Sequence, residues 1–249
     1  MAGDPSSLPE LAVVVPVRDE AENIAPLLAV IEAALASVRA LEIIYVDDGS
    51  RDATPERLRQ MRTQYPRLRV VRHKESCGQS QALVTGIRAA RAELIATLDG
   101  DGQNDPADIL RLLARLRDEP PEARNRLLVA GQRTKRRDTP IRRISSRIAN
   151  GVRSRLLGDR TPDTGCGLKV FARTAFLDMP HFDHMHRFLP ALMIRQGGRV
   201  VSVPVNHRQR QRGRSKYGLW DRLWVGIVDL LGVMWLQARA TRPVIEADP

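Results

Sequence analysis

Cysteine is scarce in this chain of 249 residues, which contains only Cys77 and Cys166. No C-x-x-C pair is present, so the sequence predicts neither a disulfide framework nor a zinc ribbon and suits a reducing compartment. Aromatic residues make up only 4% of the chain, which leaves few platforms for stacking nucleic-acid bases. A basic nucleic-acid-binding protein is therefore the less favoured class.

Long apolar runs are lacking too. Residues 1–10 are polar and show no basic segment followed by an apolar core, so we expect no signal peptide. No stretch of about 20 uninterrupted apolar residues occurs, so the sequence predicts no transmembrane helix. The expected location is the cytoplasm.

Positive charge is abundant by contrast. The chain carries 40 Lys and Arg against 29 Asp and Glu, a formal net charge of +11. A surface this basic is expected to meet an anionic partner, which includes nucleic acid, a membrane face and phosphorylated substrates.

Short apolar runs alternate with helical patterns along the chain. This alternation predicts an α/β fold with a mostly parallel, Rossmann-like sheet and helices on both faces. We find no repeat or low-complexity linker, which predicts one catalytic domain over 10–216, an amphipathic helix over 217–236, and tails at 1–9 and 237–249. The predicted strands are 11–17, 41–46, 68–73, 94–98, 127–130, 168–171 and 199–205, and the predicted helices are 20–38, 54–64, 78–91, 106–117, 140–157 and 184–196.

Acidic clusters follow two of the predicted strands, and ligands of such sheets bind where strands end. One cluster spans 47–50, and the other contains Asp99, Asp101 and Gln103. Their oxygen atoms suit Mg²⁺ or Mn²⁺ held together with a diphosphate. The alternative is that Asp-Gly pairs only form turns. No G-x-G-x-x-G follows the first strand, which argues against a dinucleotide site.

The ordered motifs of the chain resemble those of family 2 glycosyltransferases with the GT-A fold. They are Pro16-Val-Arg-Asp-Glu20, Val46-Asp-Asp-Gly-Ser50 and Leu98-Asp-Gly-Asp-Gly-Gln-Asn104. Gly131-Gln-Arg133, Asp163-Thr-Gly-Cys-Gly-Leu-Lys169 and Arg210-Gln-Arg-Gly-Arg-Ser-Lys-Tyr217 look like the polyprenyl-phosphate branch. That branch includes dolichol-phosphate mannose synthases and bacterial undecaprenyl-phosphate sugar transferases.

The resemblance implies roles for individual residues on the donor side. Two departures from the family pattern are Arg18 within the first motif and Gly100, where alanine is common, within the D-x-D. By this resemblance, Asp48 contacts the base or ribose, with Asp47 beside it, and Pro16, Val17 and Glu20 surround the nucleotide. Asp99 binds the nucleotide or the metal, and Asp101 and Gln103 bind the metal.

On the acceptor side, a phosphate monoester is already anionic near neutral pH, so a strong general base is less necessary than cations that hold two anionic groups together. Arginines cluster between 133 and 147 and again between 208 and 216. By resemblance, Asp163 faces the reacting centre and either orients the acceptor or acts as a base. By the same resemblance, Arg133 and Arg142 or Arg143, with Ser146, hold the acceptor phosphate, and Arg210 and Lys216 close over the phosphates.

Three histidines, His181, His184 and His186, raise the question of a zinc site. The set lacks a fourth ligand of obvious geometry, so a polar lining role for His186 is favoured. Cys166 is expected to be a small packing residue.

All three tryptophans lie between 220 and 235. In a helix, Trp220, Trp224, Ile227, Leu231 and Trp235 fall on one stripe, which suits the membrane interface. The alternative is an ordinary amphipathic helix packed on the domain. We expect peripheral attachment to the inner face of the membrane, with or without a separate membrane subunit.

The sequence thus predicts an inverting glycosyltransferase. It is expected to move a mannose- or glucose-like sugar from a GDP- or UDP-linked donor to polyprenyl phosphate. An amino-pentose, a uronic acid or a saccharide hydroxyl acceptor stays open.

Overall fold

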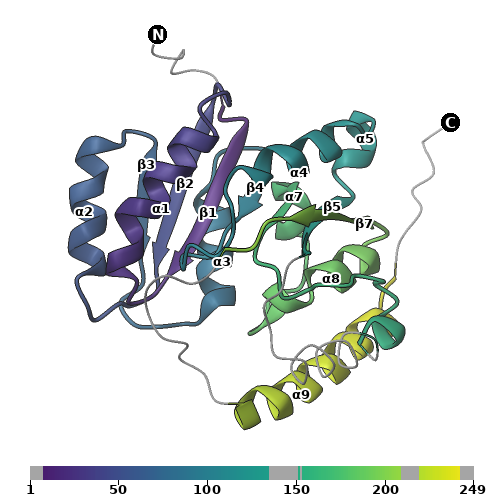
Figure 1. Cartoon of the computed structure of the whole chain (residues 1–249). Helices are drawn as coiled ribbons and strands as arrows, with labels where there is room; N and C mark the ends of the chain where they lie inside the picture. Colours follow the sequence, from purple (N-terminus) through teal and green to yellow (C-terminus); the bar gives the residue numbers. More distant parts are fainter. Residues whose placement is uncertain (1–7, 135–150, 152, 209–218, 242–249) are drawn as a thin grey trace, which may run out of the picture.

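The computed structural model describes residues 8–134, 151, 153–208 and 219–241, with side chains from residue 226 onward in the last range. A seven-stranded sheet forms its centre in the order β3-β2-β1-β4-β6-β5-β7 (Figure 1). All strands run parallel except β6, which is antiparallel to both neighbours. The strands are β1 Leu11–Val17, β2 Leu41–Asp47, β3 Leu68–Arg72, β4 Leu94–Thr97, β5 Leu127–Arg133, β6 Lys169–Ala172 and β7 Arg199–Val205.

Helices cover both faces of the sheet, as predicted. The clusters of buried residues place α1 (Ala21–Ala34), α2 (Thr54–Gln64) and α4 (Asp108–Arg117) on one face. The other face carries α3 (Gln79–Ala89), α7 (Arg173–Leu177), α8 (Leu189–Arg195) and part of α9 (Leu219–Ala238). A short helix, α5 (Pro121–Arg124), precedes β5, and a 3-10 turn, η1 (Met185–Arg187), precedes α8.

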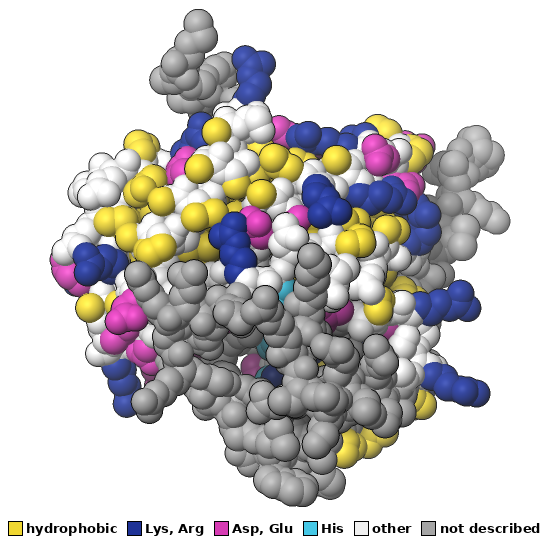
Figure 2. Space-filling model, viewed as in Figure 1, with side chains coloured by type: hydrophobic (Ala, Val, Ile, Leu, Met, Phe, Trp, Pro, Cys, Tyr) yellow, Lys and Arg dark blue, Asp and Glu magenta, His cyan; other side chains and the backbone are white. Residues whose placement is uncertain are grey.

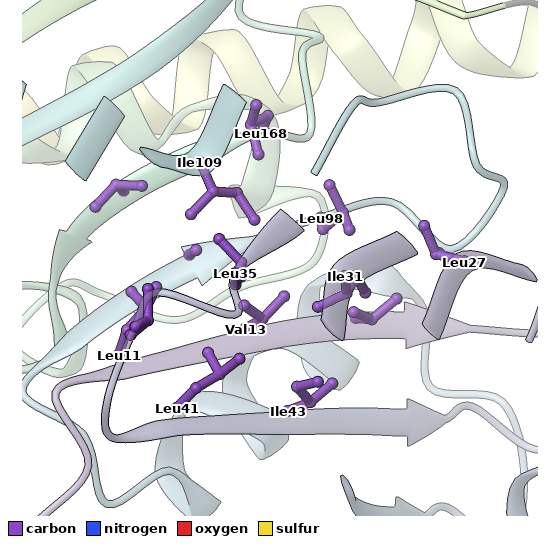
Figure 3. Close-up of a cluster of buried hydrophobic side chains, with 14 of the residues drawn as sticks. Leu11, Val13, Leu27, Ile31, Leu35, Leu41, Ile43, Leu98, Ile109 and Leu168 are labelled. Atoms are coloured by element: carbon purple, nitrogen blue, oxygen red, sulfur yellow. The ribbon is translucent and has the colours of Figure 1, made fainter. Parts of the chain in front are cut away.

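Strand β1 is apolar along its whole length because helices cover both faces of the sheet. Side chains alternate between the two faces of a strand, so Val13 joins the cluster under α1 while Val14 joins the cluster under α3. Figure 3 shows Val13 beside Ile31 and Leu35 of the α1 region and Ile43 of the neighbouring strand.

The prediction of one helix over 184–196 was wrong. The chain instead forms η1 and then α8, separated by Phe188 with φ −112° and ψ 6°. Pro190 lies in the first turn of α8, where its missing N–H does no harm, whereas inside a continuous helix it would remove a hydrogen bond. His184, at φ 63°, begins the turn in a left-handed conformation.

Strand β6 brings the segment before it to the functional edge of the sheet. Lys169 at its start pairs with Thr97, the last residue of β4, and with Ala130 of β5. Residues 163–168 therefore lie where β4 and β5 end.

Over its described side chains, from residue 226 onward, helix α9 packs on the domain through one side. Val233 is fully buried against the core, and the Arg195 side chain donates to the Leu236 carbonyl at 2.8 Å. Ile227, Leu231 and Trp235 are 43%, 59% and 60% exposed. None of the helices in the described ranges is long and apolar enough to span a bilayer.

Candidate active site at the carboxyl edge of the sheet

The motifs that follow β1, β2 and β4 meet at one edge of the sheet. The final residue of β1, Val17, pairs with Asp47 at the end of β2, and the Asp48 N–H donates to the Val17 carbonyl at 2.9 Å. A cavity of about 300 Å³ opens beside them. It is lined by Pro16, Gln79, Leu83, Thr97, Leu98, Asp99, Thr164, Gly165, Cys166, Gly167, Lys169, His186, Arg187 and Leu189.

Asp99 is the acidic residue of this cavity. Gln79 Nε2 donates to its Oδ1 at 3.0 Å, and a Cβ on Gly167 would stand 2.2 Å from its Oδ2. Withdrawal from bulk water and the nearby Asp101 charge raise the pKa of Asp99 to about 6, although Lys169 and Arg133 act in the opposite direction. Two carboxylates that repel each other in this way favour a cation between them.

The mutual repulsion of Asp99 and Asp101 suits a divalent metal, and Gln103 is a further candidate ligand on the same loop. All three offer hard oxygen atoms, the donor type that Mg²⁺ and Mn²⁺ take. Asp101 Oδ1 accepts the Gln103 N–H at 3.1 Å, across a turn in which Gly102 has φ 73°. Asp101 and Gln103 therefore lie on the same short turn.

The absence of a side chain at Gly100, between the two aspartates, has a steric explanation. A Cβ at this position would lie 2.4 Å from Cγ1 of Val17 and 3.0 Å from the Pro16 carbonyl oxygen, so even alanine would require the Val17 side chain or the acidic loop to shift. Pro16 lines the cavity, whereas Glu20 is not among the lining residues. The Glu20 carboxylate accepts from Asn23 at the start of α1.

Asp48 faces the segment 73–78 rather than the cavity. Its Oδ1 accepts from the Cys77 N–H and contacts His73 Nδ1, both at 2.8 Å, and its Oδ2 accepts from Ser76 Oγ at 2.7 Å and the Gly78 N–H at 2.9 Å. Burial raises the pKa of Asp48, but these hydrogen bonds outweigh it and hold the pKa below its usual value. Four partners fill the acceptor positions of a carboxylate.

Asp48 therefore organises the 73–78 segment, and a nucleotide that reached it would have to share the carboxylate with these donors. Asp47 is fully buried, and it accepts the Ser50 N–H at 2.9 Å and pairs with Arg72 at 3.1 Å. Its contacts hold the turn after β2.

Asp163 and Arg133, assigned separately in the sequence, pair with each other. The guanidinium donates through Nε and Nη2 to the two carboxylate oxygens at 2.7 Å each, and the Arg133 N–H adds a third bond at 3.2 Å. The two side chains are only 16% and 6% exposed. Burial lowers the pKa of Arg133, but the hydrogen bonds and charge of Asp163 raise it by more. The net pKa is above its usual value, so the guanidinium stays charged.

The three histidines do not form a metal site. His181 contacts Arg88, His184 pairs with Asp229 on α9, and His186 contacts Ser80. Within the described ranges, the one group of three His, Cys, Asp or Glu ligand atoms within 4.8 Å is Asp48, His73 and Cys77. Cys166 is buried, which raises its thiol pKa, in keeping with the packing role expected of it.

Four residues at the cavity were not predicted from the sequence: Gln79, Lys169 and Arg187 line it, and Ser80 contacts His186. Lys169 is 3% exposed, its ammonium donates to the Cys166 carbonyl, and burial lowers its pKa. Lys169 ends the 163–169 family motif, so its place at the site could have been predicted from the sequence. No local motif marks Gln79 or Ser80. Five predicted residues lie outside the described ranges: Arg142, Arg143, Ser146, Arg210 and Lys216.

The predicted basic loop leaves from beside the candidate metal loop. The Arg208 N–H donates to the Gln103 carbonyl at 2.8 Å, and the Arg208 guanidinium pairs with Asp105 at 2.8 Å. Asn104 and His207 form an antiparallel bridge between the same segments. Figure 2 shows acidic, basic and histidine side chains close together near the centre of this view.

Comparison with known sequences gives a consistent set of relatives. The profile described as glycosyl transferase family 2 matches residues 12–179. The chain is 37% identical over 245 residues to the dodecaprenyl-phosphate galacturonate synthase of Rhizobium johnstonii, across 96% of this chain and 71% of the relative. It is 35% identical over 212 residues to the undecaprenyl-phosphate 4-deoxy-4-formamido-L-arabinose transferase of Edwardsiella ictaluri, across 84% of this chain but only 63% of the relative.

Solved structures share the fold at lower identity. Mannosyltransferase PcManGT from Pyrobaculum calidifontis, in complex with GDP-Man and Mn²⁺, superposes with a TM-score of 0.64 at 21% identity, over 97% of this chain and 67% of that one. Glucosyl-3-phosphoglycerate synthase from Mycobacterium tuberculosis, with Mn²⁺, UDP and phosphoglyceric acid, gives 0.67 at 17% identity, over 94% and 80%.

Proposed function

Because this chain belongs to glycosyl transferase family 2 and has a GT-A fold, we propose that it transfers a sugar from a nucleotide-sugar to the phosphate of a polyprenyl phosphate. The observation that carries the proposal is the cavity in which Asp99 meets residues 164–167, the segment that follows Asp163, the ion-pair partner of Arg133. The two relatives named above act on polyprenyl phosphates, as their names state, which supports the acceptor class.

The donor side of the site would be built on the acidic loop. Asp99, Asp101 and Gln103 would hold Mg²⁺ or Mn²⁺, and a bound divalent cation stabilises a departing diphosphate as a Lewis acid. The solved neighbours with Mn²⁺ and GDP-Man or UDP are consistent with this donor class. Pro16 and Val17 would form the wall of the nucleotide pocket, and Asp48 would hold the 73–78 segment in place. Asp47 and Glu20 would support that wall through the turns that they fix.

The acceptor side would rely on fixed positive charge. A phosphate oxygen of the lipid attacks the anomeric carbon and the nucleoside diphosphate leaves from the opposite face, so the configuration inverts. Arg133 would attract the phosphate while Asp163 fixes its guanidinium, since a bidentate pair holds a planar fork in one orientation. An Asp163 held in this way suits orientation better than proton abstraction. Arg142, Arg143, Ser146, Arg210 and Lys216 stay predictions for the same anions.

The test of this function is incubation with a panel of donors. The panel contains UDP-glucose, UDP-galacturonic acid, GDP-mannose and a UDP-linked amino-pentose, each with Mn²⁺ or Mg²⁺ and undecaprenyl phosphate. We expect one donor to yield a sugar-phosphate lipid, identified by mass spectrometry and lost when EDTA is added. Failure of every donor with this acceptor, together with transfer to a saccharide hydroxyl, would contradict the proposal.

We further propose that α9 docks on the membrane surface where the acceptor resides. Its exposed side carries Ile227, Val228, Leu231 and Trp235, and Leu156 beside the helix is 47% exposed. The Gln237 side chain, which donates to the Leu157 carbonyl at 3.0 Å, joins α9 to that neighbouring segment. Apolar side chains on one helix face, with tryptophan among them, suit the depth of the lipid headgroups. A separate membrane subunit stays a prediction.

Replacing Leu231 and Trp235 together with glutamate is expected to lower recovery on anionic phosphatidylglycerol vesicles at least about tenfold, because burying each side chain contributes about 1.5–3 kcal/mol. Flotation on a density gradient measures the bound fraction. Leu8→Glu is the matched control, because Leu8 is 66% exposed and lies just before β1, which is well separated from α9 in Figure 1. Equal recovery of both variants would argue for a purely packing role of α9.

A further inference from the structure

A hydrogen bond joins α3 to η1, two segments that are 106 residues apart in the sequence. Ser80 in the first turn of α3 is 3% exposed, and its Oγ lies 2.8 Å from Nδ1 of His186 in η1. The backbone N–H of His186 also donates to the same Oγ, at 3.3 Å. The hydroxyl therefore receives one hydrogen bond and still has its own proton to donate.

This geometry favours one tautomer of His186. A buried hydroxyl donates its proton to some acceptor, and in the described residues the partner within reach of the Ser80 hydroxyl is His186 Nδ1. If Nδ1 accepts, the ring proton must reside on Nε2. Burial, together with the charge of Arg187, lowers the pKa of His186 to about 3, so the ring stays neutral at physiological pH.

The opposite edge of the ring is available to a ligand. His186 lines the same cavity as Asp99 and Thr164, and no described residue hydrogen-bonds to its Nε2. A neutral N–H is a weak attractor for a phosphate, which the arginines and lysines of this chain suit better, but it is a good donor to a hydroxyl or ring oxygen. The cavity adjoins the candidate metal loop, where the sugar end of a donor would lie.

We propose that Ser80 and His186 form a sugar-recognition pair, in which Ser80 fixes the tautomer and His186 Nε2–H donates a hydrogen bond to an oxygen of the donor sugar. This inference rests on the proposed function, because it assumes a nucleotide-sugar in the cavity. His186 contacts the substrate, and Ser80 is a positioning residue that acts through it.

Binding measurements separate recognition of the sugar from recognition of the nucleotide. Affinities for UDP-glucose, UDP-galacturonic acid and GDP-mannose are compared with those for UDP and GDP in the presence of Mn²⁺. His186→Phe is expected to weaken binding of the preferred nucleotide-sugar about tenfold and leave the matching nucleoside diphosphate unchanged, since one neutral hydrogen bond is lost. His186→Gln keeps an N–H donor and is expected to recover most of the loss. His181→Gln, outside the cavity lining, is the control.

The tautomer is read directly by ¹⁵N NMR of histidine-labelled protein. His186 is expected to show a protonated Nε2 and an accepting Nδ1 at pH 7, and Ser80→Ala is expected to abolish that preference while Ser80→Thr keeps it. A protonated Nδ1, or equal effects of His186→Phe on nucleotide-sugar and nucleoside diphosphate, would overturn the inference. If the wild type binds none of the nucleotide-sugars, the proposed function fails, whereas the NMR result still tests the pair by itself.

Discussion

Replacing Asp101 with alanine is expected to lower the rate of sugar transfer by at least about 100-fold while the protein stays folded. In the proposed function, Asp101 would offer an oxygen to a divalent cation that stabilises the leaving diphosphate, so its removal would cost charge stabilisation that is greatest in the transition state. The side chain is partly exposed, and its described hydrogen bond is to the Gln103 N–H within one turn, so its removal costs little stability.

The experiment compares product formation and thermal unfolding for the same samples. Lipid product is quantified by mass spectrometry at several Mn²⁺ concentrations, because a weakened metal site raises the concentration needed for half-maximal rate. Asp118→Ala, an exposed position at the end of α4, is the matched control and should keep full activity. Turnover of Asp101→Ala near that of the wild type would contradict the metal assignment.

Replacing Asp163 with asparagine is expected to lower the free energy of unfolding by about 3–5 kcal/mol and to suppress transfer as well. The substitution leaves the Arg133 guanidinium with a neutral partner in a site where its side chain is 16% exposed. A loss of that size corresponds to a fall in melting temperature of about 10 °C for a domain of this length.

A second variant separates stability from activity. Arg133→Met combined with Asp163→Leu removes both charges, and replacing a buried ion pair by apolar side chains is often neutral for stability. We therefore expect the double variant to regain much of the lost stability but to stay inactive. Glu56→Gln serves as the comparison, since it breaks the Arg59 pair, whose side chains are 68% and 52% exposed, and should change stability by less than about 1 kcal/mol. A double variant that transfers sugar normally would remove Arg133 and Asp163 from the mechanism.

Local sequence was enough to place the strands along the chain. Strand β7 has the bounds predicted from its pattern, and α2 has them too, because strand and helix periods are properties of adjacent residues. The place of the acidic loop could also be predicted from neighbouring residues, because a carboxylate directly after a buried parallel strand lies at the carboxyl edge of the sheet. The sequence did not reveal that β6 runs antiparallel, because strand direction depends on how the chain returns between 134 and 168.

What the sequence determined by itself is thus the order of the strands along the chain, the edge at which the candidate site lies, and the acidic residues placed there. Only the tertiary structure decided the partner of each side chain. It turned Asp48 toward the 73–78 segment, joined Arg133 to Asp163 across 30 positions, and brought Ser80 to His186 across 106. The physical reason is that periodicity and turn chemistry act between neighbours, whereas hydrogen bonds of buried polar groups are satisfied by whichever element the packing brings within 3 Å.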